Sequence, residues 1–197
     1  MNTVLPVSIY AESTPNPVSM KFVLNTLLAG AEGESLEYRN KEQALSSPLA
    51  EKLFALPFTR GVFISSNFIT LTQDGSLDWY EIIPEVKEII KTHIDAKLPV
   101  FTGSAKQVPD PVSVTAPGND TEEKIISILN EYIRPAVEGD GGAIHFRSFD
   151  NGVVTVMLKG ACSGCPSSAV TLKNGIENLL TRMVPGVQKV IAENDIL

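Results

Sequence analysis

The sequence predicts an α+β fold made of two small domains joined by a proline-rich linker. Residues 99–118 hold four prolines and show neither a helical nor an alternating period. On both sides of this segment, short alternating stretches are mixed with longer stretches of helical spacing. At roughly 100 to 200 residues per domain, the 197 residues leave room for two small domains. We therefore expect a first domain over 1–98, a linker over 99–118 and a second domain over 119–197.

The first domain is expected to combine short strands with two helices. A turn at Thr14–Pro17, which contains two prolines, separates the first two strands. Ser47 followed by Pro48 is typical of a helix cap and a first helical residue, and Pro57 ends that helix. The expected elements are strands at Val7–Ser13 and Ser19–Leu24, a helix from Pro48 to Leu56, two strands within Gly61–Thr72 around Asn67, and a helix from about Pro84 to Ala96.

The second domain is expected to run in the order helix, hairpin, cysteine loop, helix and strand. Asp120 with Glu123 forms a capping-box pattern, and Pro135 with the turn Gly139–Gly142 is expected to end the first helix. The dipeptide Asn151-Gly152 tolerates the positive φ angles of a type I′ hairpin turn. The further elements expected are strands at Ile144–Phe149 and Val153–Leu158, the loop Gly160–Pro166, a helix that buries Leu172, Ile176, Leu179, Leu180 and Met183, and a strand at Val187–Ile191.

Composition excludes several classes of protein. The formal net charge is −7 and there is no basic block, so a nucleic-acid partner is not expected. No stretch approaches the roughly 18 apolar residues that cross a bilayer, so no membrane partner is expected either. The first fifteen residues lack the pattern of a signal or transit peptide, which predicts a cytoplasmic protein that acts on proteins or small ligands.

The two cysteines, Cys162 and Cys165, carry the strongest chemical signal in the sequence. A structural disulfide is not expected in a reducing compartment, so this C-x-x-C pair indicates chemistry. The pair lies in a glycine-containing loop between a strand and a helix, where backbone N–H groups without helical partners favour the thiolate form. The amides of Ser163, Gly164, Ser167 and Ser168 are the expected donors to sulfur, since Pro166 has no N–H.

Four interpretations of the cysteine pair compete. The cysteines could be small buried hydrophobic residues, although a loop flanked by glycines is a poor core element. A thioredoxin-like dithiol needs further strands after its motif, and only 32 residues follow Cys165. A structural zinc site needs four ligands, yet His93 lies on an apolar helix face and His145 in a hairpin strand. The fourth interpretation is an iron–sulfur cluster held by the two thiolates.

An iron–sulfur cluster would make each chain half of a binding site. Common clusters take four cysteine ligands and this chain supplies two, so a second protomer or another molecule must complete the site. A cluster bridged across a weak dimer interface is exposed and replaceable, which favours a carrier over an electron-transfer protein.

The same residues resemble a known family. The segments Gly139–Gly142, Leu158–Ser168 and Val184–Val187 together resemble the Nfu domain, the C-terminal module of NifU-type iron–sulfur proteins, over about Thr121 to Glu193. Thr14–Pro17 followed by Met20-Lys-Phe22 is similar to the N-terminal domain of Nfu proteins. Ala143 departs from the pattern, because an acidic residue is common after the paired glycines.

The resemblance implies a function without catalysis. It implies a scaffold or carrier, not an enzyme, that binds a [4Fe–4S] cluster, or a [2Fe–2S] form, through Cys162 and Cys165 of two protomers. It also implies that the carrier receives the cluster from an upstream assembly scaffold and passes it to apo iron–sulfur client proteins. A thiol–disulfide oxidoreductase that uses the same cysteine pair is the alternative of another class.

Overall fold

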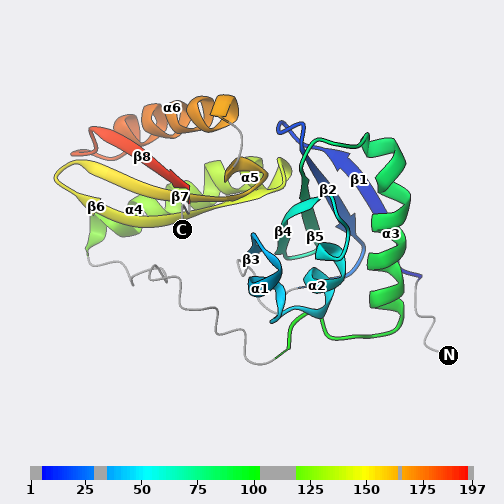
Figure 1. Ribbon diagram of the computed structural model, residues 1–197. Helices are drawn as coiled ribbons and strands as arrows, with labels where there is room; N and C mark the ends of the chain where they lie inside the picture. Colours follow the sequence, from blue (N-terminus) through cyan, green and yellow to red (C-terminus); the bar gives the residue numbers. More distant parts are fainter. Residues whose placement is uncertain (1–5, 29–34, 103–118, 164–165, 195–197) are drawn as a thin grey trace. The chain divides into compact units, whose positions relative to one another are not determined.

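The computed structural model describes residues 6–28, 35–102, 119–163 and 166–194 (Figure 1). The chain divides into two compact units, of which the first ends at Lys106 and the second begins at Gln107. That division falls inside the expected linker, most of which lies outside the described residues. Each unit contains one sheet and its own helices, so the α+β class is confirmed. Within the described part of the chain, no helix is both long enough and apolar enough to span a membrane.

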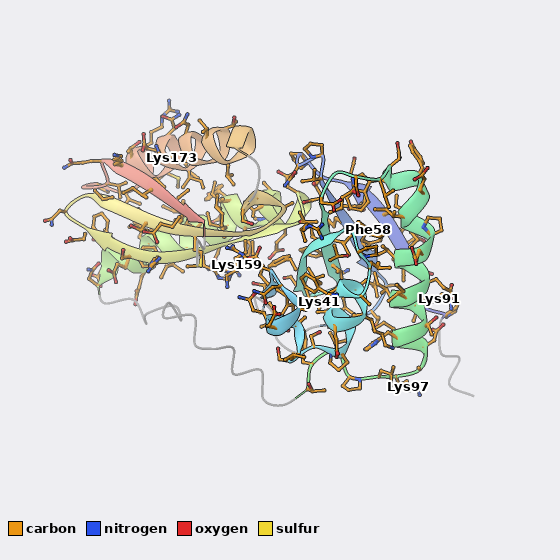
Figure 2. All side chains as sticks on the ribbon, in the orientation of Figure 1. Lys41, Phe58, Lys91, Lys97, Lys159 and Lys173 are labelled. Atoms are coloured by element: carbon orange, nitrogen blue, oxygen red, sulfur yellow. The ribbon has the colours of Figure 1, made fainter. Side chains whose placement is uncertain are left out.

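The first unit is a five-stranded antiparallel sheet with helices packed on it. The strand order is β1-β2-β5-β4-β3. Alternate strand residues such as Phe22, Ile64 and Leu71 share one hydrophobic core with Leu53 and Ile90 from the helices. Figure 2 draws the side chains of the unit as sticks and labels Phe58, another residue of this core. The elements are β1 (Ile9–Ser13), β2 (Ser19–Leu24), β3 (Ser35–Tyr38), α1 (Lys41–Ala44), α2 (Pro48–Phe54), β4 (Thr59–Ser65), β5 (Phe68–Gln73) and α3 (Trp79–Asp95).

In the first unit, a capping side chain marks the beginning of a helix more closely than a proline does. The Ser47 side chain accepts a hydrogen bond from the Ala50 N–H, so the predicted start of α2 is confirmed. The predicted start of α3 at Pro84 is wrong, because Asp78 caps a helix that begins five residues before Pro84, at Trp79, and Pro84 lies inside it. A proline this close to a helix start removes one hydrogen bond without ending the helix. Strand β3 and helix α1 were not predicted, since four residues are too few to show a period.

The second unit is a three-stranded sheet, in the order β6-β7-β8, that shares one core with its helices. Strands β6 and β7 are antiparallel, whereas β7 and β8 are parallel and are connected through α6. The elements are α4 (Asp120–Ile128), a π-helix (Leu129–Ile133), α5 (Arg134–Gly139), β6 (Gly142–Asp150), β7 (Val153–Gly160), a 3-10 turn (Ala161–Ser163), α6 (Pro166–Met183) and β8 (Lys189–Asn194).

The first helix of the second unit continues past Pro135 and ends at Gly139, so the prediction is wrong for Pro135 and confirmed for the turn that begins at Gly139. The preceding turn widens into a π-helix, in which the Arg134 N–H donates to the Leu129 carbonyl. In an ordinary α-helix, the ring of Pro135 would clash with the carbonyl four residues earlier, and the wider turn relieves that clash. The cap also differs by one residue from the prediction, since Asn119 and not Asp120 accepts from the Glu122 N–H.

Two local features join the strands of this unit. Asn151 and Gly152 have φ angles of 48° and 82°, and Asp150 pairs with Val153, so the predicted two-residue hairpin is confirmed. Strand β8 is tied to α6 by Glu177, whose carboxylate accepts from the Val190 N–H at 2.9 Å. This hydrogen bond, with a contribution from Lys173, lowers the pKa of Glu177.

The start of the expected linker is attached to the first unit. The Ser47 hydroxyl donates to the Val100 carbonyl at 2.7 Å, and the Thr102 N–H donates to the Ser46 carbonyl at 2.9 Å. His93, which is fully buried in α3, donates from Nε2 to the Pro99 carbonyl at 3.1 Å. Its Nδ1 is buried and has no hydrogen-bond partner among the described residues. Burial, together with the nearby charge of Lys52, lowers the pKa of His93.

We expect the first unit to lose stability as the pH falls through the ordinary pKa of histidine. His93 is neutral in the folded unit and binds a proton more readily when unfolded, so the unfolded state gains protons first. Protonation in the folded state would bury an N–H at Nδ1 with no acceptor. Thermal unfolding between pH 7.5 and 5 should show a falling midpoint for the first unit. In His93→Gln the slope against pH should be smaller, and an unchanged slope would contradict this assignment.

Candidate functional site

The cysteine loop begins at the carboxyl end of β7, which is the middle strand of the second unit's sheet. Gly160, the last residue of β7, has a φ of +68°, a left-handed backbone conformation that residues other than glycine rarely adopt. A short 3-10 turn follows and carries Cys162. The 18-residue helix α6 begins at Pro166, directly after the motif, as predicted. The loop therefore joins the carboxyl end of one strand to the amino end of a long helix.

Gly142, at the start of β6, determines how closely Cys162 can approach the sheet. Gly142 pairs with Gly160 across the ladder. A Cβ atom on Gly142 would lie 2.6 Å from the Lys159 carbonyl oxygen and 2.8 Å from the Cys162 sulfur. Neither distance is possible for real atoms, so any side chain at this position would displace the turn. The absence of a Cβ thus creates the space that Cys162 occupies.

Two further hydrogen bonds hold the turn in place. The Ala161 N–H donates to the Gly141 carbonyl at 3.2 Å, and the Ser163 hydroxyl donates to the Gly160 carbonyl at 3.0 Å. Gly141 has a φ of +80°, so the paired glycines supply both the backbone conformation and the space for the cysteine turn. The sequence predicts a turn at the end of a helix for Gly139–Gly142, and it does not predict this contact with the cysteine turn. Two adjacent glycines after a helix end were the available signal for a close backbone approach.

Cys162 is buried, with 5% of its surface exposed, and belongs to the core of the second unit. This differs from the expectation that the loop is a poor core element, and the reason is the space beside Gly142. Cys165 and Gly164 lie outside the described residues, as do the side chains of Pro166 to Ala169. The pairing of the two sulfurs, and the donors expected from the amides around them, stay predictions.

The histidines lie on elements other than the cysteine loop. His93 is in the core of the first unit, where its Nε2 is hydrogen-bonded to Pro99. His145 is on β6, opposite Met157 in the ladder. In the ranges that the structure describes, no three residues among His, Cys, Asp and Glu gather as metal ligands would. These positions add no support to a zinc site.

The arrangement favours binding of a cation by thiolate. The partial positive charge at the start of a helix as long as α6 stabilises an anion next to it. Lys159, labelled in Figure 2, is on the strand that leads into the loop, three residues before Cys162. A thiolate near a helix start is a stronger nucleophile and metal ligand than an ordinary cysteine.

Comparison with known proteins matches both units to family profiles. Residues 9–97 match the family described as scaffold protein Nfu/NifU N terminal, and residues 125–191 match the NifU-like domain. Two similar curated relatives are the mitochondrial NFU1 iron-sulfur cluster scaffold homologs of Drosophila willistoni and Drosophila persimilis. Both are 38% identical over 182 residues, or 92% of this chain. The chain spans 62% and 64% of the length of these two relatives.

A solved structure resembles only part of the chain. The solution structure of a NifU-like protein from Saccharomyces cerevisiae matches with a TM-score of 0.44 and 21% identity. The match covers 54% of this chain and 92% of that one.

The predicted cytoplasmic location is wrong, because these relatives are named mitochondrial proteins. The prediction relied on the composition of the first residues. A compartment is specified by a targeting segment that folding does not require, so the pattern of the folded domains carries no information about it.

We expect Gly142→Ala to destabilise the second unit by about 1–3 kcal/mol, because the added methyl group must displace the cysteine turn. The matched control is Gly139→Ala, where a Cβ would have no neighbour within 4 Å. Urea unfolding, followed through amide signals of the second unit, measures both changes. Equal stability of the two variants would contradict the role assigned to Gly142.

Proposed function

Since the chain belongs to the Nfu family of iron–sulfur cluster scaffold proteins, we propose that it binds a [4Fe–4S] cluster and transfers it to apo-proteins. Cys162 and Cys165 are the iron ligands in this proposal. The observation that carries it is the glycine-bounded turn between β7 and α6, which positions Cys162 beside the start of a long helix. Thiolates at a helix start suit iron, and small neighbours leave room for a bulky cluster.

The cluster is shared between two protomers in this proposal. One chain offers two thiolates and a cluster takes four, so a second copy supplies the missing pair. Each half-site then holds the cluster through only two iron–sulfur bonds. Such a cluster can be released without unfolding of either domain, as a carrier requires.

Loading requires a local movement of the cysteine turn. Cys162 is 5% exposed, so its sulfur must move outward before iron can reach it. The turn is held by the Ala161–Gly141 hydrogen bond and is bordered by glycines in left-handed conformations. Opening of a short turn that few hydrogen bonds hold costs much less than global unfolding. The turn is therefore suited to reversible opening.

Transfer proceeds by exchange of thiolates. An acceptor thiolate forms a bond to iron as the bond from Cys162 or Cys165 breaks, and the released thiolate takes up a proton. No electron is transferred, so the cluster keeps its oxidation state. The acceptors are apo iron–sulfur proteins, and an upstream assembly scaffold supplies the cluster. Residues 119–197 form the cluster-binding domain, and the linker 99–118 connects it to the first domain, 1–98.

Both cysteines should be needed for cluster binding. Loss of either leaves two thiolates for a shared cluster, which is too few. Cys162→Ala and Cys165→Ala should each reduce bound iron and sulfide after anaerobic reconstitution to background, while circular dichroism stays unchanged. Ser163→Ala, which removes the hydroxyl bond to Gly160 and keeps both cysteines, is the matched control and should still bind cluster. Full iron content in either cysteine variant would refute the ligand assignment, and a colourless wild type would favour a dithiol enzyme.

Direct transfer is the experiment that tests the carrier function. The reconstituted protein, mixed with an apo-enzyme that needs a [4Fe–4S] cluster, should activate it faster than equivalent free iron and sulfide. A chelator present throughout should not prevent activation, because exchange bypasses free iron. If the chelator abolishes activation while the donor still holds its cluster, the protein stores clusters and does not deliver them.

A further inference from the structure

The first two turns of α3 expose an apolar surface that the proposed function does not use. Leu77, just before the helix, is 41% exposed, and Tyr80 is 88% exposed. Pro84, four residues after Tyr80, is also exposed. The spacing of four residues places Tyr80 and Pro84 on one face of the helix, opposite the buried Ile82 and Val86, and Leu77 directly precedes the cap Asp78. Helix α3 is the green helix in Figure 1.

We call this surface the Tyr80 face and define it by Leu77, Tyr80, Glu81, Pro84 and Glu85. It is built on a backbone that is fixed at several points. The Trp79 Nε1–H donates to the Pro17 carbonyl at 2.9 Å, which ties the helix start to the proline turn at Thr14–Pro17. Exposed groups on a rigid backbone lose little entropy when a partner binds.

Neighbouring hydrogen bonds extend this rigidity. The Tyr80 N–H donates to the Asp78 carboxylate at 2.9 Å. The Gln73 side-chain amide donates to the Leu77 carbonyl, also at 2.9 Å. The helix start that carries Tyr80 is well fixed, yet the Tyr80 ring is exposed and adds little to the packing of the fold. Such a ring is available for contact with another molecule.

The polar groups of the Tyr80 face are hydrogen-bond acceptors. Glu81 and Glu85 are exposed, and among the described residues neither forms a salt bridge. Pro84 has no N–H, so the Tyr80 carbonyl lacks its α-helical donor. The surface thus offers an aromatic ring and a backbone carbonyl, with two carboxylates on the flank of the helix next to Tyr80 and Pro84 and with Lys87 three residues after Pro84.

We propose that the Tyr80 face docks a segment of another protein that carries arginine next to an apolar residue. A guanidinium is planar and donates up to five hydrogen bonds, so it can stack on the Tyr80 ring while bonding to the carboxylates and the free carbonyl. The apolar neighbour packs on Leu77 and Pro84. A second copy fits poorly, because two such acidic faces would repel each other on a chain of net charge −7.

The test uses three synthetic peptides of about 15 residues with leucine at helical spacing and arginine, lysine or glutamate at the positions between. Each is titrated into the full-length apo-protein and followed by amide chemical shifts. We expect the arginine peptide to shift the signals of residues 77–85. It should bind more tightly than the lysine peptide, and the glutamate peptide should not bind. Tyr80→Ser should weaken the arginine peptide about fivefold, as loss of one cation–π contact predicts.

The matched control is Tyr10→Ser, which removes another exposed tyrosine of the same unit, on β1, and should leave binding unchanged. Glu81→Gln with Glu85→Gln should weaken binding and reduce its salt dependence. Three outcomes would overturn the proposal. They are no binding at millimolar peptide, binding that Tyr80→Ser does not change, and concentration-dependent shifts of residues 77–85 without peptide, which would identify a second copy as the occupant.

Discussion

The close approach of Gly142 to the cysteine turn is the constraint on which the rest of the site depends. Hydrogen is the only substituent that fits between the Gly142 backbone, the Lys159 carbonyl and the Cys162 sulfur. Because of this contact, Cys162 can lie in the core of the second unit although it belongs to the loop that follows the carboxyl end of β7. The site is therefore made by two glycine-rich segments, about twenty residues apart in sequence, that meet across one pair of strands.

Elements with a local chemical signal could be predicted from the sequence. The Ser47 cap, the Asn151-Gly152 turn and strand β2 depend on a few neighbouring residues, and the structure agrees with each. In both units, a helix boundary predicted at a proline was wrong. Pro84 and Pro135 lie within helices because a cap at Asp78 and a wider turn at Leu129–Ile133 outweigh the single hydrogen bond that each proline removes.

The chemistry that we propose for the candidate site comes from the sequence, whereas the geometry of the site could not be predicted from it. The C-x-x-C spacing and the flanking glycines pointed to thiolate ligands for metal, and the family match supports that class of function. The burial of Cys162 could not be predicted, because it follows from the register that places Gly142 opposite Gly160. Register depends on contacts between distant residues, and no local pattern specifies a Cβ clash.

The parallel pairing of β7 with β8 has a consequence for how the site forms during synthesis. The β6–β7 hairpin needs only a two-residue turn, and such hairpins form within about 1–10 μs. Val154 can pair with Val190 only after α6 has been synthesised. This contact joins residues that are much farther apart in sequence than the two strands of the hairpin, so it forms later. Until that crossover closes, α6 lacks the hydrogen bond between Glu177 and the β8 backbone. A nascent chain therefore holds Cys162 beside Gly142 on the hairpin before Ile176 and Leu180 of α6 complete the core around it, and oxidation or stray metal can reach the thiols in this interval.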